Sequence, residues 1–311
     1  MTSAPPTAGG TELLSYRAYR GLSRGPASAV WAIARSGLVG ILRRKLFWGL
    51  FAAAVMIFLF FFFSLYLMSW VESQAGEQSV PFMGGQVKPA DMLGFFRKSL
   101  KLDDPARLYR NVIWYEGYVV MIVLALAGSV LVGNDFRFGS LPFYLSKPIG
   151  RWHYVGGKCL AVAIFTNLLT TFFAACLWVE NGLLEGWAYF WDGRNHLVGL
   201  VGYGAVLTVV FSLLLVATAG WVRKTVPMVM VWTALFVFAR TLGENLVRFT
   251  DQPRWRLVDL WSDAYVLGNW CLGMPGEGSF PAPGEAAMVL GGVCLACLIY
   301  LNRRIRAVEI V

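Results

Sequence analysis

The chain has 311 residues, of which 57% are hydrophobic and only 14% are charged, and its formal net charge is +9. With a mean hydropathy of +0.58, this composition excludes an ordinary soluble domain, in which charged residues make up about 25%. It predicts an integral membrane protein embedded in a lipid bilayer, whose positive charge reflects topology, so we expect no nucleic-acid binding.

Six windows are long and apolar enough to cross a bilayer, which requires about 20 residues of helix. They are too apolar for alternating barrel strands, and every backbone group in lipid must be hydrogen-bonded within the protein. We therefore predict an all-α fold with a six-helix transmembrane domain over residues 46–302. The spans are expected at residues 46–70, 112–132, 159–179, 197–222, 226–242 and 286–302.

Two segments precede the first span. Residues 1–26 are expected to form a cytoplasmic N-terminal segment, and residues 27–45 a basic amphipathic helix in the membrane interface. Helical spacing predicts the apolar face of this helix at Trp31, Ala34, Leu38, Ile41 and Leu42, and its polar face at Ser28, Arg35 and Arg43. The alternative is an ordinary basic juxtamembrane segment without an apolar face.

Basic residues gather at residues 17–45, 133–158, 223–224 and 303–306. The positive-inside rule places all four groups on the cytoplasmic side, so both termini, including a tail at 303–311, are predicted to be cytoplasmic. The outer loops are then expected at residues 71–111, 180–196 and 243–285.

The predicted cytoplasmic loop at residues 133–158 has a helical pattern of its own. Leu141, Tyr144 and Leu145 recur at i, i+3 and i+4, which predicts a short helix with one apolar face. Pro142 requires this helix to begin near residue 141, and Pro148 ends it. An apolar face in the cytosol needs a partner, although an ordinary basic linker is the alternative.

The sequence shows no signature of catalysis by this chain alone. A phosphate-binding loop needs G-x-x-x-x-G-K-[ST], and the Gly-Gly-Lys that ends at Lys158 has Trp152 at the first glycine and Cys159 at the last position. No His, Cys, Asp or Glu cluster with metal-ligand spacing is readable. We expect that the chain is not an enzyme by itself and binds no metal or cofactor.

The loop also carries the longer pattern N-D-x-R-x-G-S-L-x-x-x-L-S-K-P-x-x-R-x-x-Y-x-x-G-K, from Asn134 to Lys158. It resembles the first cytoplasmic loop of ABC-2 type permeases, the membrane subunits of ATP-binding-cassette exporters. In that family an interfacial amphipathic helix precedes six spans, and a coupling helix in this loop docks on a separate ATPase subunit. The predicted layout is similar over almost the whole chain.

The resemblance implies a permease subunit in a plasma membrane, the bacterial inner membrane. It implies two kinds of partner: a second permease copy, identical or homologous, and an ATPase subunit that binds ATP and Mg²⁺. Within the loop, Leu141, Tyr144 and Leu145 would supply apolar docking, and Arg137, Lys147 and Arg151 polar contacts or phospholipid contacts. The full set of implied coupling residues is Asp135, Arg137, Gly139, Leu141, Tyr144, Leu145, Lys147, Pro148 and Arg151.

Two ionisable residues lie inside predicted spans. Glu116 is about one helical turn into the second span, and Arg240 is about one turn from the outer end of the fifth. Because ionisable groups in lipid are costly unless paired, we expect them to pair with each other or to line an outer gate. The alternative is that Arg240 pairs with Glu244 one turn on, and that Glu116 faces the outer aqueous edge.

Two other classes of function are weighed against a permease subunit. A secondary carrier would couple transport to ions through intramembrane ionisable residues and would need no ATPase, but few such residues are present. The other class is a membrane-embedded enzyme or an assembly scaffold. An enzyme would show a cluster of catalytic residues, and none is visible in the sequence.

Overall fold

The computed structural model describes residues 25–73, 80–82, 85–87, 104–140, 150–274, 276 and 279–305. Within them the chain is helical apart from one short antiparallel hairpin. Six helices are long and apolar enough to cross a membrane, each at a predicted span. The all-α architecture of a polytopic membrane protein is therefore confirmed.

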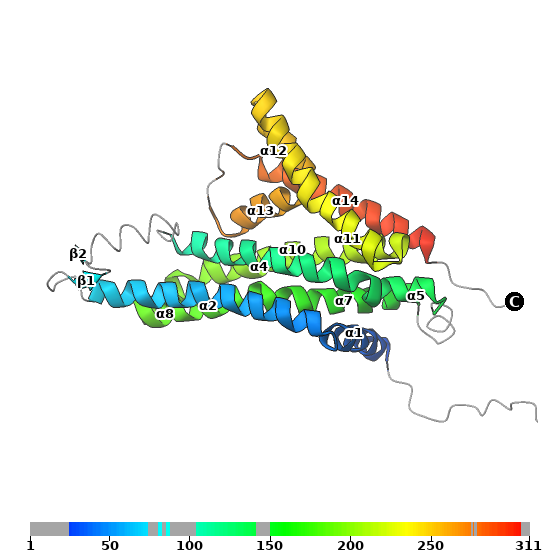
Figure 1. The fold of residues 1–311 in the computed structure, drawn as a ribbon, viewed down its shortest axis with the longest axis horizontal. Helices are drawn as coiled ribbons and strands as arrows, with labels where there is room; N and C mark the ends of the chain where they lie inside the picture. The colour runs from blue at the N-terminus through cyan, green and yellow to red at the C-terminus, as the bar shows by residue number, and fades with distance from the viewer. Residues whose placement is uncertain are drawn as a thin grey trace, which may run out of the picture.

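Helix α1 (Pro26–Leu42) lies at one end of the bundle, where it packs on the third span, at a steep angle to the first span, α2 (Lys45–Ser73) (Figure 1). Its buried residues are Ile33, Ala34, Gly37 and Ile41. Of the predicted apolar face, Ala34 and Ile41 pack against the bundle, whereas Trp31 and Leu42 are exposed. Close packing selects the small Ala34 and Gly37 as the contact, which turns Trp31 away from the bundle.

The second span consists of three consecutive helical pieces. Helix α4 (Pro105–Gly128) passes into a π-helix, η1 (Ser129–Gly133), and then into α5 (Asn134–Arg137). Between the first two spans, β1 (Val80–Phe82) pairs with β2 (Gly85–Val87). Figure 1 places this hairpin at one end of the bundle and α1 and α5 at the other. We call these the hairpin end and the α1 end.

The third span extends further than its apolar window. It comprises α7 (Arg151–Leu169) and α8 (Thr171–Glu185), so the expected loop at 180–196 is largely helical. The remainder of this loop forms α9 (Trp187–Asp192), and the fourth span, α10 (Arg194–Val222), follows directly. Helical hydrogen bonding continues past the point at which the sequence becomes polar.

The fifth span contains a second π-helix. Helix α11 (Thr225–Thr233) passes into η2 (Ala234–Phe238) and α12 (Ala239–Thr250), and α12 rises away from the bundle (Figure 1). The segment that follows, within the expected outer loop at 243–285, forms a 3₁₀-helix, η3 (Pro253–Val258), and α13 (Leu260–Cys271). The sixth span is α14 (Pro283–Arg304).

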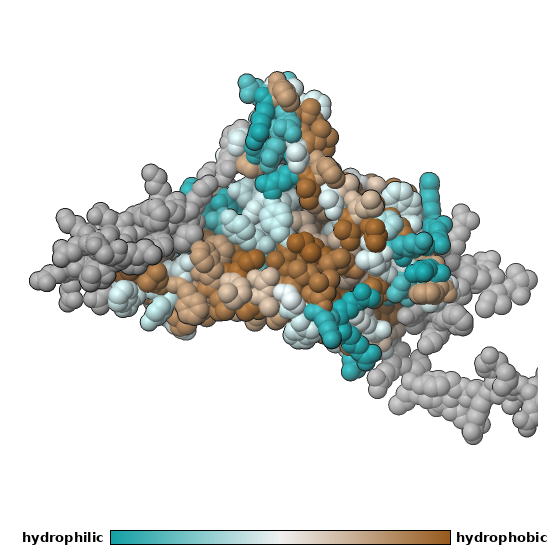
Figure 2. Space-filling view, in the orientation of Figure 1, coloured by the Kyte–Doolittle hydropathy of each residue, from teal (hydrophilic) through white to brown (hydrophobic). Residues whose placement is uncertain are grey.

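The six spans are buried to very different extents. In the second, third and fourth spans, 67%, 50% and 61% of the most apolar window is buried, whereas the first, fifth and sixth have 11%, 22% and 17%. Figure 2 shows the resulting hydrophobic surface over the middle of the bundle, with hydrophilic residues on α12 and at the α1 end. The second, third and fourth spans thus form the core, and the other three offer apolar surface to lipid or to another chain.

Candidate functional site

At the α1 end, a buried ion pair joins the two helices that flank the patterned loop. Lys158 Nζ on α7 lies 2.7 Å from Asp135 Oδ2 on α5, with 7% and 14% of the respective side chains exposed. Tyr154 donates a hydrogen bond to the same carboxylate at 2.8 Å. Lys158 also donates to the carbonyl oxygen of Leu131. We call Asp135, Tyr154 and Lys158 the loop-base network.

The π-helix η1 lies at the centre of these contacts. A π-helix is a one-residue bulge in an α-helix, and here its Leu131 carbonyl receives the Lys158 ammonium. Its first residue, Ser129, is hydrogen-bonded to Thr225 at the start of α11, at 2.7 Å between the hydroxyl oxygens. Helix α1 also contacts η1. The second span is therefore linked at one level to α1, to the third span and to the fifth.

The structure describes some of the predicted coupling residues. Asp135 belongs to the loop-base network. Arg137 is exposed with its guanidinium 5.3 Å from the Phe138 ring centroid, and Gly139 has φ +66°. Arg151, at the start of α7, donates to the Asn302 carbonyl at 3.5 Å, a long hydrogen bond. The predicted docking residues Leu141, Tyr144, Leu145, Lys147 and Pro148 lie outside the described residues.

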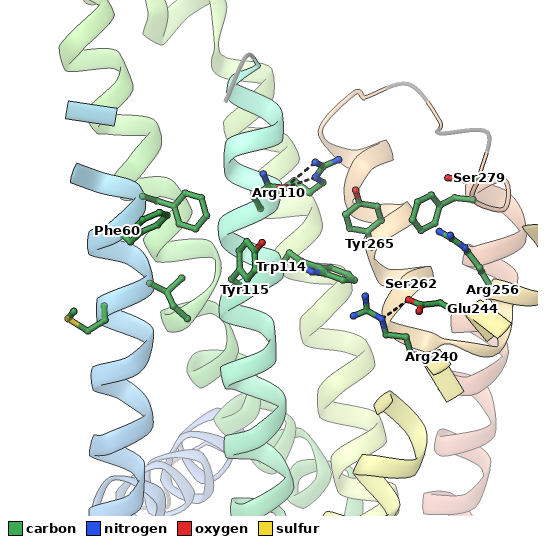
Figure 3. Close-up of a pocket in the computed structure, with 15 residues that line it drawn as sticks. Phe60, Arg110, Trp114, Tyr115, Arg240, Glu244, Arg256, Ser262, Tyr265 and Ser279 are labelled. Atoms are coloured by element: carbon green, nitrogen blue, oxygen red, sulfur yellow. Dashed lines mark hydrogen bonds and ion pairs between the residues drawn. The ribbon is translucent and has the colours of Figure 1, made fainter. Parts of the chain in front are cut away.

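Towards the hairpin end, a cavity of about 830 Å³ crosses α4 between α2 and the α12–α13 region (Figure 3). One wall is apolar and is formed by Met56, Ile57, Phe60 and Phe61 of α2. The opposite wall carries most of the polar groups, with Arg240 and Glu244 from α12, Arg256 from η3 and Ser262 from α13. Arg110 and Tyr115 of α4 lie between the two walls.

Aromatic rings surround the cavity's three guanidinium groups. Arg240 lies 5.5 Å from the centroid of Trp114 and donates to the hydroxyl of Tyr118. Arg110 lies 5.1 Å from the ring of Tyr265. The corresponding distance from Arg256 to Phe280 is 4.1 Å. Aromatic faces attract cations, so these contacts hold the guanidinium groups in place.

Arg240 and Glu116, which were predicted to form a pair or an outer gate, are separate in the structure. Arg240 Nε lies 3.0 Å from Glu244 Oε1, which is the alternative pairing. Glu116 is fully buried instead of facing an aqueous edge, and neither of its carboxylate oxygens has a hydrogen-bond partner among the described residues. Arg240 thus lines the cavity, whereas Glu116 faces the core.

The sequence interpretation missed several polar residues of this region. Arg110 and Arg256 were assigned to outer loops without a role. Glu180 was expected in a loop but is buried in α8, and Asp263 is fully buried in α13; neither carboxylate has a hydrogen-bond partner among the described residues. Burial, and secondarily the nearby Asp259, raises the pKa of Asp263. In the sequence, the signal for Glu180 and Asp263 was a single acidic residue inside an apolar helical pattern.

Neither known families nor metal chemistry identifies the site. No protein-family model matches the chain, and no curated protein matches it at a significant level. Among the described residues, no group of three or more His, Cys, Asp or Glu side chains could hold a metal ion. The function is therefore argued from the residues and their geometry.

Proposed function

We propose that this chain is the transmembrane permease subunit of an ABC exporter of the ABC-2 type. The carrying observation is the pattern from Asn134 to Lys158, because the loop-base network consists of pattern residues. Asp135 and Lys158 lie on opposite sides of the loop and form a buried ion pair. The spacing of the pattern thus has a physical reason, which is to hold the two ends of a loop together.

A further pattern residue supports the proposal. A Cβ atom at Gly157 would lie 2.7 Å from Cβ of Ile33 and 3.0 Å from the carbonyl oxygen of Val30, both on α1. Glycine at this position therefore lets α1 approach α7 closely. Helix α1 and the end of the patterned loop are joined through this contact.

In the proposed mechanism, movement enters through the loop at 133–158. A partner ATPase subunit, which binds ATP and Mg²⁺, docks on the apolar face at Leu141, Tyr144 and Leu145. The loop-base network makes α5 and α7 move as a unit, because breaking a buried ion pair costs several kcal/mol. Through η1 and Ser129, this displacement reaches α11 in the fifth span and changes the shape of the cavity between α2 and α12.

Several parts of the proposal concern the assembly. The α1 end faces the cytoplasm, so the cavity lies in the outer half of a plasma membrane, the bacterial inner membrane. Two permease copies, identical or homologous, flank one pathway and bind two ATPase subunits. The uncovered surfaces of the first, fifth and sixth spans support a second copy, because a lone bundle leaves them to lipid alone.

Co-purification with the partner ATPase tests the proposal. We expect the double substitution Leu141→Asp and Leu145→Asp to abolish recovery of the ATPase subunit, because two carboxylates cannot be buried in an apolar docking groove. The matched control, Leu141→Met and Leu145→Met, keeps the apolar face and should keep the complex. Recovery of an intact complex with the aspartate variant would show that this loop does not dock the ATPase.

One observation favours a second candidate, an ion-coupled carrier. Glu116 and Glu180 are buried in spans with no hydrogen-bond partner among the described residues, and such residues mark ion pathways in secondary transporters. Substrate uptake into proteoliposomes distinguishes a carrier from an ABC permease. A carrier transports its substrate under a proton gradient without an ATPase subunit or ATP. A Glu116→Gln variant would then lose transport, whereas an ABC complex would keep its ATP dependence.

A further inference from the structure

The cavity over α4 combines an apolar wall with cationic groups. Glu244 is the only acidic residue among its described lining residues, whereas Arg110, Arg240 and Arg256 carry guanidinium groups. The Glu244 carboxylate forms an ion pair with Arg240, with 3.0 Å between Glu244 Oε1 and Arg240 Nε. Arg256 contacts the ring of Phe280, and its Nε has no hydrogen-bond partner among the described residues. Arg240 is thus paired with Glu244, whereas Arg256 has no ion pair among the described residues.

Two further acids lie close to the cavity on or beside α13, and neither forms an ion pair with Arg256. Burial raises the pKa of Asp259, and it raises the pKa of Asp263 to about 8. Asp263 is thus mostly neutral at pH 7. One oxygen of Asp259 accepts the backbone N–H of Trp261 at 3.0 Å, and the carboxylate interacts electrostatically with Arg240, which Glu244 also pairs.

The apolar wall is open to the hydrocarbon of a bilayer. Met56, Phe60 and Tyr115 are 66%, 55% and 51% exposed, although all three line the cavity. Figure 3 shows Phe60 on one side of α4 and Arg240, Arg256 and Tyr265 on the other, with Tyr115 on α4 itself. A ligand that lies across α4 would place an apolar portion against α2 and an anionic portion against the guanidinium groups.

We propose that this cavity binds an anionic amphiphile, a lipid with a phosphate headgroup, which enters sideways from the membrane. Its acyl chains lie along Met56 and Phe60, and its phosphate lies between Arg240 and Arg256. A planar guanidinium binds phosphate oxygens through paired hydrogen bonds. That this lipid is the transported substrate rests on the proposed function, whereas its binding to the isolated chain does not.

Other ligand classes fit the cavity less well. A free anion would leave the exposed aromatic wall of α2 unused. A lipid without net charge would leave the Arg256 guanidinium without an anion near the hydrocarbon, where an uncompensated charge costs several kcal/mol. Only a molecule with both an apolar and an anionic part satisfies the two walls together.

Native mass spectrometry of the full-length chain tests the proposal. The purified protein is titrated with phosphatidylglycerol, with phosphatidylcholine and with inorganic phosphate, and bound species are counted. We expect phosphatidylglycerol to bind at least about tenfold more tightly than phosphatidylcholine, and phosphate alone to bind negligibly. Equal affinity for the two lipids, or equal binding of free phosphate, would overturn the proposal.

Matched variants connect this binding to the cavity. Arg256→Gln is expected to weaken phosphatidylglycerol binding about tenfold, whereas Arg256→Lys, which keeps the charge but loses the paired hydrogen bonds, should weaken it less than Arg256→Gln. The control is Arg248→Gln, which removes an exposed arginine of α12 that does not line the cavity. An equal loss of phosphatidylglycerol binding in the control would show that the effect comes from surface charge in general, and it would refute the site.

The second permease copy is the competing occupant of the cavity. If an acidic side chain of that copy fills it, phosphatidylglycerol binds only to monomers, and dimers show no preference between the two lipids. That result would also overturn the proposal. None of these measurements uses the ATPase, so a failed co-purification test and a failed lipid test are independent results.

Discussion

At the scale of single residues, Lys158 has the contacts of a structural cation. Its ammonium group contacts the Asp135 carboxylate and the Leu131 carbonyl, and 7% of its side chain is exposed. Removing one partner of a buried pair costs about 3–5 kcal/mol, because the other charge is left uncompensated. We expect Lys158→Met to lower the melting temperature of the purified protein by on the order of 5–10 °C, measured by tryptophan fluorescence.

Two controls identify the cause of this loss. Lys224→Met removes an exposed lysine and should leave the melting temperature unchanged. The double variant Lys158→Met and Asp135→Asn removes both charges and should recover most of the stability, because neither charge is then left alone. Losses in the double variant equal to the sum of the two single losses would contradict an ion pair.

Some residue contacts followed directly from spacing and others did not. Arg240 and Glu244 are one helical turn apart, so their pairing was available from the sequence as an alternative. The contact between Asp135 and Lys158 could not be predicted from the sequence, because it depends on how α5 is oriented after a π-helix. A bulge of one residue rotates everything that follows by about 100°, and no periodic pattern marked it in the sequence.

At the scale of elements, the contact of α1 with α7 depends on one of two adjacent glycines. A Cβ atom at Gly157 would collide with α1, whereas one at Gly156 would meet nothing within 4 Å. We expect Gly157→Ala to loosen α1, so that amide hydrogen exchange over residues 26–42 becomes faster. Gly156→Ala should leave exchange over residues 26–42 unchanged, because the added methyl group lies on α7 and does not meet α1. Equal exchange in both variants would refute this packing.

The elements themselves were largely predictable, because length and hydropathy determine spans in a bilayer. All six spans occur at the predicted apolar windows. The orientation of α1 was not predictable in detail, since Trp31 fits an apolar stripe but the small Gly37 provides the contact surface. Likewise, the position of α13 beside the cavity depends on tertiary packing of Trp261, which local periodicity does not contain.

At the scale of the whole molecule, the unequal burial of the spans has a consequence for assembly. The first, fifth and sixth spans bury 11%, 22% and 17% of their apolar windows, so half of the bundle's spans mostly face outward. The cavity is bordered by α2 and α12, which belong to two of these three spans. A second copy that packs against them would enclose the cavity between two chains.

The proposed assembly predicts a fixed stoichiometry. Two permease copies present two patterned loops, so the complex purified with its ATPase should contain two of each subunit, or two homologous permeases with two ATPase subunits. Native mass spectrometry of the intact complex measures this directly. The Leu141→Asp and Leu145→Asp variant should leave the permease dimer and lose both ATPase subunits together, since the predicted docking residues are at the α1 end and the pairing surfaces lie along the spans. One permease bound to two ATPase subunits would contradict the proposal that two permease copies flank one pathway, because a single chain would then enclose the pathway alone.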